Sequence, residues 1–399
     1  MKSAVMLTYE IDDVKVAAQE LASGIREKIN FGKSTFGIIH CDADVDVEEL
    51  SKLLHEDLGC EIVGLTTTAL IERSSGYCDM GIVLAVITGD DIDISIGNTN
   101  ELTKLEFQDQ IKSAYSNARS ILPEDPKLIL VCAPYIPDIT SEKYLESLDE
   151  LSGHAPIFGG VATDHYDLQY QKTFHNGNAY SSGLIFILLT GNIKPVFAMQ
   201  HNFGGKIKRK GIITKSTANM VNQIDDKTFV QFLSEITPIP DDDTVIYQFQ
   251  STPFIMELPD RVKDEQPVVR ALCSIDHETG SGGFLSKMPE GSALSINIIQ
   301  RDNLAFSCAE TLDHLLEKMQ QSKDDYCMIL ISSCNARHLL MGDKKNLEAK
   351  IISDRLADVE PGLNAIGFYG FGEMCPTVFS EEEQAKNRFH NISFALCAF

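Results

Sequence analysis

The feature that most constrains the fold of this chain is a pattern of an apolar strand, an amphipathic helix and a second apolar strand, which occurs three times. Each apolar run is short and rich in β-branched residues, as is typical of a strand covered on both faces of its sheet. Two strands joined by such a crossover helix are expected to run parallel. A cysteine closes the first strand of each copy, and glycine accompanies the second. The paired strands are residues 36–41 and 62–68, 128–132 and 157–160, and 328–334 and 364–373.

Two further matches favour duplication of a larger unit. Residues 81–89 and 183–191 share one layout, an apolar strand between two glycines, and Phe174-His175-Asn176 recurs as Phe389-His390-Asn391. We interpret the repeated unit as strand, helix, strand, glycine turn and antiparallel strand. The predicted fold class is therefore α/β in the mixed α+β sense, with duplicated units that form mixed sheets flanked by helices in two related halves.

The length of the chain, 399 residues, is enough for two or three domains. We expect an N-terminal domain over residues 1–220 and a C-terminal domain over residues 221–399. The last strand, within residues 390–399, is expected to pack with either half.

Composition limits the partners and the location of the protein. The formal net charge is -24, from 58 acidic and 34 basic residues, and this field repels nucleic acid. No apolar run approaches the roughly 20 residues of a membrane span, and the first residues lack the features of a signal peptide. The ten cysteines are scattered and form no Cys-x-x-Cys pair, which indicates reduced thiols. We therefore expect a cytoplasmic protein without membrane insertion.

Arg337 and Glu373 are the strongest candidate site residues, because both should lie at the C-terminal edge of adjacent strands, where α/β sheets bind ligands. A guanidinium group can bind a carboxylate through two hydrogen bonds, and a carboxylate can bind an ammonium group. The pair would suit a zwitterion such as an amino acid; alternatively, the two side chains bind each other. The other predicted ligand-binding residues belong to the same edge or to the matching turns of the other units: Cys334, Asn335, Tyr369, Gly370, Gly372, Gly159, Gly160, Asp164, Thr66 and Thr67.

Cys334 could instead act as a nucleophile with His338, which lies four residues further on. A reactive thiol needs a lowered pKa and an oxyanion site, and neither can be read from sequence. The strand-end positions of Cys41 and Cys132 favour packing for all three cysteines. We therefore predict that the protein is not an enzyme.

Metal and haem sites have weaker signals. Asp42, Asp44 and Asp46 alternate as in a calcium loop, but Val47 stands where the glycine is required and Leu53 where the glutamate is required. A solvated helix N-terminus is the preferred interpretation. The histidines show no His-x-x-x-His spacing, and no metal site is predicted. One imidazole is enough for an axial haem ligand, so haem stays open as an alternative cofactor, with the candidates His165, His175, His201, His338 and His390.

The order of these motifs resembles the FIST domain family over nearly the whole chain. The N-terminal half resembles it in the threonine-rich end of residues 62–68, in Phe158-Gly159-Gly160-Val161-Ala162-Thr163-Asp164 and in the hairpin over residues 174–183. Ala69 and Thr163 replace glycines that the family pattern leads us to expect. The C-terminal half resembles it in residues 289–292, 333–337, 367–373 and 389–391.

This resemblance implies a sensory module for a small ligand, such as an amino acid, that acts with kinases, cyclases or chemoreceptors. Some bacterial members of the family are thought to bind haem and to respond to nitric oxide. We therefore expect a stand-alone sensor that signals to a separate protein, with a haem-based gas sensor and a protein-interaction scaffold as alternatives.

Overall fold

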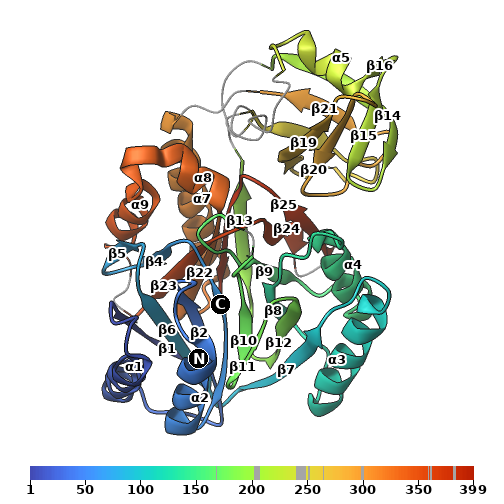
Figure 1. The fold of residues 1–399 in the computed structure, drawn as a ribbon. Coiled ribbons are helices and arrows are strands. Elements are labelled where there is room, and N and C mark those ends of the chain that lie inside the picture. Colours follow the sequence, from blue (N-terminus) through green and yellow to red (C-terminus); the bar gives the residue numbers. More distant parts are fainter. Residues whose placement is uncertain are drawn as a thin grey trace.

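The computed structural model describes the chain apart from residues 168, 202–206, 240–248, 250–251, 264, 298–300, 358, 360–361 and 381–382. The described residues form three six-stranded sheets flanked by helices and one eight-stranded sheet (Figure 1). This confirms the predicted fold class, a mixed α/β fold built from repeated units. None of the described helices combines the length and the apolar character that crossing a membrane requires.

The first sheet has the strand order β1-β6-β2-β3-β10-β11. Strands β2 and β3 are parallel, with α2 as the crossover, and β6 lies antiparallel to β2. Asp46 caps α2 by accepting a hydrogen bond from the Glu49 amide, so this acidic stretch does begin a helix as predicted. The elements are β1 (Lys2–Thr8), α1 (Val14–Lys28), β2 (Ser34–Cys41), α2 (Val47–Leu58), β3 (Glu61–Thr66), β6 (Ile82–Gly89), β10 (Thr173–His175) and β11 (Asn178–Tyr180).

The second sheet, with the order β25-β24-β9-β8-β12-β7, repeats this arrangement. Its parallel pair is β8 and β9, and β12 lies antiparallel to β8. The elements are β7 (Ile92–Glu101), α3 (Phe107–Ile121), β8 (Leu128–Ala133), α4 (Ser141–Leu151), β9 (Ile157–Val161), β12 (Gly183–Gly191), β24 (Glu373–Ser380) and β25 (Glu383–His390).

The third sheet, β13-β26-β22-β23-β4-β5, contains the third copy. Its parallel pair is β22 and β23, and β26 lies antiparallel to β22. The crossover consists of α8, a 3-10 turn (Gly342–Lys344) that begins at a glycine with a φ of 57°, and α9. The elements are β4 (Leu70–Glu72), β5 (Gly76–Cys78), β13 (Val196–Gln200), α7 (Arg301–Ser322), β22 (Met328–Cys334), α8 (Asn335–Met341), α9 (Leu347–Leu356), β23 (Asn364–Gly370) and β26 (Phe394–Ala398).

The three units exchange their hairpins in a cycle. The β4-β5 hairpin of the first unit extends β23 of the third, and the β24-β25 hairpin of the third extends β9 of the second. The β10-β11 hairpin of the second unit extends β3 of the first. The predicted duplication thus extends to three units whose sheets share strands from both ends of the chain. The last strand, β26, pairs with β13 as well as with β22.

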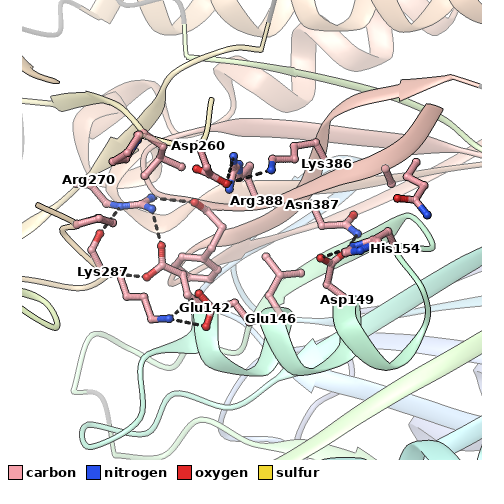
Figure 2. Close-up of a pocket in the computed structure, with 17 residues that line it drawn as sticks. Glu142, Glu146, Asp149, His154, Asp260, Arg270, Lys287, Lys386, Asn387 and Arg388 are labelled. Atoms are coloured by element: carbon pink, nitrogen blue, oxygen red, sulfur yellow. Dashed lines mark hydrogen bonds and ion pairs between the residues drawn. The ribbon is translucent and has the colours of Figure 1, made fainter. Parts of the chain in front are cut away.

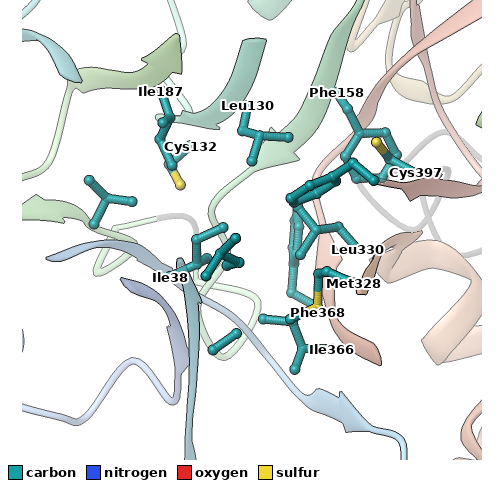
Figure 3. Packing of buried hydrophobic residues seen from close by; sticks show 14 of the residues in the cluster. Ile38, Leu130, Cys132, Phe158, Ile187, Met328, Leu330, Ile366, Phe368 and Cys397 are labelled. Atoms are coloured by element: carbon teal, nitrogen blue, oxygen red, sulfur yellow. The ribbon is translucent and has the colours of Figure 1, made fainter. Parts of the chain in front are cut away.

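The inner faces of the three sheets meet in one apolar core. Each unit contributes side chains to it, among them Ile38, Leu130 and Leu330 from equivalent strands (Figure 3). The next residue along β2, Ile39, faces the opposite side and packs with α1 and α2. Because neighbouring residues of a strand point to opposite faces, both faces of these central strands are buried. We call this arrangement the three-sheet body.

A separate lobe, the β lobe, contains the eight-stranded sheet and α5, and it lies at one end of the three-sheet body (Figure 1). It has its own core, in which Phe229, Phe254 and Phe284 contact one another. The elements are β14 (Arg209–Thr217), β15 (Met220–Ile224), β16 (Lys227–Thr228), α5 (Phe229–Ser234), β17 (Phe254–Glu257), β18 (Val268–Arg270), β19 (Leu272–Asp276), β20 (Ser281–Phe284) and β21 (Ala293–Ile296).

Candidate functional site

The C-terminal ends of β3 and β23 and the turn that follows β9 are hydrogen-bonded to one another. The Thr163 amide donates to the Thr66 carbonyl at 2.9 Å, and the Thr163 hydroxyl donates to the Tyr369 carbonyl at 2.9 Å. The Tyr369 amide in turn donates to the Thr67 hydroxyl oxygen at 3.0 Å. The structure therefore brings the predicted glycine and threonine turns together, but it joins them to one another.

Two glycines of the predicted site are required by this packing. A Cβ atom on Gly160 would lie 2.9 Å from the Gly372 carbonyl oxygen and 2.8 Å from the Ser332 hydroxyl oxygen. At Gly372, φ is 127° and a Cβ atom would lie 2.2 Å from the Phe389 ring. Thr66, Thr67 and Asp164 are also fully or almost fully buried. The absence of a side chain at Gly160 and Gly372 lets the neighbouring strands approach each other closely.

Arg337 is fully buried, and its carboxylate partner is Glu348. Its Nε atom donates to Glu348 Oε1 at 2.7 Å, and Nη2 donates to the Ser307 hydroxyl and the Leu304 carbonyl, each at 3.1 Å. The expectation that Arg337 faces Glu373 at an open rim is therefore wrong, because α9 supplies a closer carboxylate. No ion pair between Arg337 and Glu373 occurs among the described residues, so the alternative pairing does not form either.

Glu373 lies nearby in the interior, where its Oε2 atom accepts hydrogen bonds from the Ser393 hydroxyl at 2.6 Å and the Ser393 amide at 3.2 Å. Burial raises the pKa of Glu373 to about 8, although the Ser393 bonds act in the opposite direction. Burial also raises the pKa of the Cys334 thiol far above its usual value. Neither a charged carboxylate nor a reactive thiolate is favoured here at neutral pH.

Four predicted site residues nevertheless retain unused hydrogen-bonding capacity. Within the described part of the chain, no partner is found for Arg337 Nη1, Glu373 Oε1, the Tyr369 hydroxyl or either side-chain amide atom of Asn335, all of which are buried. Buried polar atoms are nearly always paired, so such a group of atoms needs an explanation. We call these four residues the inner polar cluster.

A pocket of about 710 Å³ lies elsewhere, between α4, β25 and the β lobe (Figure 2). None of the predicted site residues lines it. Its walls come from four stretches of the chain that sequence reasoning did not connect. The polar lining residues are Glu142, Glu146, Asp149, His154, Asp260, Arg270, Lys287, Gln384, Lys386, Asn387 and Arg388.

A buried ion pair joins the three-sheet body to the β lobe at this pocket. Arg270 of β18 donates to Glu142 of α4, and the side chains are 2% and 9% exposed. Arg270 also donates to the Phe389 carbonyl of β25 at 2.8 Å. Burial raises the pKa of Glu142, and the charge of Arg270 opposes that rise. Glu142 further accepts a hydrogen bond from the Lys287 amide, so this pair fixes several segments at one end of the pocket.

The opposing walls of the pocket differ in charge. The α4 wall carries Glu146, which pairs with Lys287, and Asp149, which is bonded to His154 and Asn387, whereas the β25 wall carries Lys386 and Arg388 (Figure 2). Lys386 Nζ and Arg388 Nη2 each lie 3.0 Å from the carboxylate of Asp260, which belongs to a loop of the β lobe. These charged ends are partly exposed, so a solute can compete for them.

Residues 35–227 match the FIST N domain family, and residues 230–376 match the FIST C domain family. The chain belongs to the FIST family. FIST domains are sensory domains of signal transduction. The boundary predicted at residues 220 and 221 remains a prediction.

Solved structures add little to this assignment. Phosphoribosylformylglycinamidine synthase II from Thermotoga maritima is 9% identical to the FIST protein, with a TM-score of 0.21, and the match covers 100% of this chain and 72% of that chain. T. maritima PurL complexed with FGAR is 8% identical, with a TM-score of 0.22 and coverage of 99% and 72%. No curated protein matches the chain in sequence. Similarity at this level carries no argument about function.

The histidines of the FIST protein have distinct surroundings. His338 lies between two tyrosines, with Nε2 at 2.9 Å from the Tyr77 hydroxyl and Nδ1 at 2.7 Å from the Tyr166 hydroxyl. His201 and His390 are buried with their rings 5.7 Å apart, and burial lowers the pKa of both imidazoles. His175 is bound to Glu61 at 2.6 Å. The fifth haem candidate, His165, lies beside two aspartates.

Proposed function

We propose that this FIST protein is a cytoplasmic sensor that binds a small zwitterionic metabolite, such as an amino acid, in the pocket between α4, β25 and the β lobe. The observation that supports this most is the opposite charge of the two pocket walls, carboxylates on α4 and cations on β25. A volume of about 710 Å³ also falls in the range of about 300–1,000 Å³ that small-molecule sites occupy.

Both ends of a zwitterion find complementary groups in this pocket. The ligand carboxylate would replace Asp260 as the partner of Lys386 Nζ and Arg388 Nη2, while Arg388 Nε keeps its bond of 2.6 Å to Glu265 Oε1. The ligand ammonium group would lie toward Glu146 and Asp149. This assignment places recognition on partly exposed side chains rather than on Arg337 and Glu373.

The position of the pocket also supports a signalling role. Its lining comes from the three-sheet body and from the β lobe, so a bound ligand would contact both. A ligand that prefers one relative placement of two parts shifts the population toward that placement. We propose that a separate kinase, cyclase or chemoreceptor reads this change.

Lys386→Gln tests the proposal, because it removes one cation from the pocket and keeps the length of the side chain. An amino acid that stabilises the wild-type protein in a thermal-shift screen should bind Lys386→Gln about tenfold or more weakly, since a charged hydrogen bond contributes about 1.5–3 kcal/mol. The melting temperature without ligand should hardly change, because the Lys386–Asp260 pair is partly exposed. Calorimetric titration gives the affinities.

Lys350→Gln is the matched control, because Lys350 forms an exposed ion pair with Asp354 on α9, away from the pocket. Its affinity for the ligand should equal that of the wild type. If Lys386→Gln and Glu146→Gln both bind the ligand as tightly as the wild type, the pocket is not the ligand site.

The inner polar cluster is a second candidate for the same function, because its unpaired atoms include a guanidinium nitrogen and a carboxyl oxygen. Tyr369→Phe removes one of these atoms with little change in shape. Loss of ligand binding in Tyr369→Phe, together with normal binding in Lys386→Gln, would move the site to this cluster. The haem sensor and the interaction scaffold stay predictions, and an absorbance band after haemin addition would support the former.

A further inference from the structure

Two aspartates and a histidine from distant parts of the sequence converge on one point. Asp42 and Asp44 lie between β2 and α2, and His165 lies in the loop after β9. His165 Nε2 is 3.3 Å from Asp42 Oδ1 and 3.5 Å from Asp44 Oδ2. One oxygen or nitrogen atom from each residue lies within 4.8 Å of the other two. Three potential metal ligands are therefore gathered, two of them from the acidic stretch at residues 42–46.

The burial of Asp42 is a second, independent indication of a ligand. Its side chain is only 1% exposed, and its Oδ1 atom accepts a hydrogen bond from the Asp44 amide at 2.9 Å. Its Oδ2 atom is buried and has no hydrogen-bond partner within the described part of the chain. This oxygen belongs to the same carboxylate whose Oδ1 atom lies 3.3 Å from His165 Nε2. An unpaired buried carboxylate oxygen is costly, and a bound cation would compensate it.

The distances agree with a small ion in a tetrahedral site. Bonds of about 2.0–2.1 Å to nitrogen and oxygen place tetrahedral donors roughly 3.3–3.4 Å apart. The two measured separations from His165 Nε2, 3.3 and 3.5 Å, are close to this value. A calcium site would instead need about 6–8 oxygen donors, and imidazole suits zinc and its neighbours among the transition metals.

We propose that Asp42, Asp44 and His165 bind a divalent transition-metal ion, zinc in the first instance. The half-exposed His165 and the exposed Asp44 give the ion a route from solvent, and they leave a position for water or another small ligand. The ion would connect the first unit to the loop that follows β9. Tyr166 of that loop is hydrogen-bonded to His338 of α8, so metal binding would order a segment in contact with the third unit.

Calorimetric titration of ZnCl₂ into the full chain, with any affinity tag removed, tests the proposal. The wild-type protein should show one saturable site, and His165→Asn should lack it. His154→Asn is the matched control. His154 is also a half-exposed histidine beside an aspartate, Asp149, but among the described residues these two belong to no group of three possible metal ligands. That variant should bind zinc as the wild type does.

Two results would overturn the proposal. The first is the absence of saturable zinc binding to the wild-type protein, or equal binding by His165→Asn. The second is the spectrum of a cobalt-substituted sample: a strong near-ultraviolet band from thiolate ligation would assign the metal to cysteines. The proposal predicts visible bands from nitrogen and oxygen ligation that are lost in Asp44→Asn, with an unchanged melting temperature for that exposed position.

Discussion

The carboxyl group of Glu373 is buried, and burial favours its neutral form. Burial raises its pKa from 4.5 to about 8, despite two hydrogen bonds from Ser393. The unfolded chain therefore loses this proton at a lower pH than the folded protein. Between these two pKa values the folded state holds more protons, so the contribution of Glu373 to stability falls as pH rises from about 4.5 to 8.

Glu373→Gln should remove this dependence, because the amide has similar shape and no charge to bury. We expect the free energy of unfolding of the wild type to fall relative to the variant as pH rises from 5 to 8, by up to roughly 1.4 kcal/mol per pH unit. Urea denaturation of both proteins at pH 5, 6.5 and 8 measures the difference. Parallel pH profiles would show that Glu373 is already ionised in the folded protein at low pH.

Arg337 holds three helices together at the scale of secondary-structure elements. The residue belongs to α8, its carboxylate partner Glu348 belongs to α9, and its other acceptors, Leu304 and Ser307, belong to α7. Glu348 also accepts a hydrogen bond from the Ser333 hydroxyl at the end of β22. This network closes the outer face of the third sheet without contacting the pocket.

Arg337→Ala should therefore destabilise the protein by about 3–5 kcal/mol, because it leaves the Glu348 carboxylate buried without a counter-charge. Chemical denaturation measures the loss. The double variant Arg337→Met with Glu348→Leu should recover much of it, since apolar residues of similar volume often replace buried ion pairs well. An unchanged free energy of unfolding in Arg337→Ala would contradict this structural role and would favour the earlier prediction that Arg337 binds a ligand.

The sequence was informative where local pattern decides the structure. Apolar runs predicted the parallel pairs, and the end cysteines lie in register with the second strands: Cys41 faces Thr66, Cys132 faces Gly160 and Cys334 faces Gly370. The helix interruption at Gly342 carried only a weak signal, a single glycine. The sequence therefore did not reveal that Glu348 at the start of α9 would reach Arg337 of α8.

At the scale of the whole molecule, the site depends on contacts that no local pattern contains. The exchanged hairpins have strands as short as three residues, and β4 pairs with a strand almost 300 residues away. The pocket likewise combines α4, β25 and two loops of the β lobe. Sequence periodicity predicts elements and their faces, but the partners of short edge strands are set by tertiary packing. The pocket was therefore missed, and β25, which forms one of its walls, is a largely polar segment with no clear strand pattern.

In the proposed function, one small ligand contacts the three-sheet body and the β lobe at the same time. Hydrogen exchange measured by mass spectrometry, with and without an amino acid that stabilises the protein, tests it most directly. We predict slower exchange in α4, in residues 384–389 and in the β-lobe loops at residues 258–260 and 287–289, which line the pocket. Slower exchange confined to residues 335–337 and 369–373, or no change at any of these segments, would contradict it.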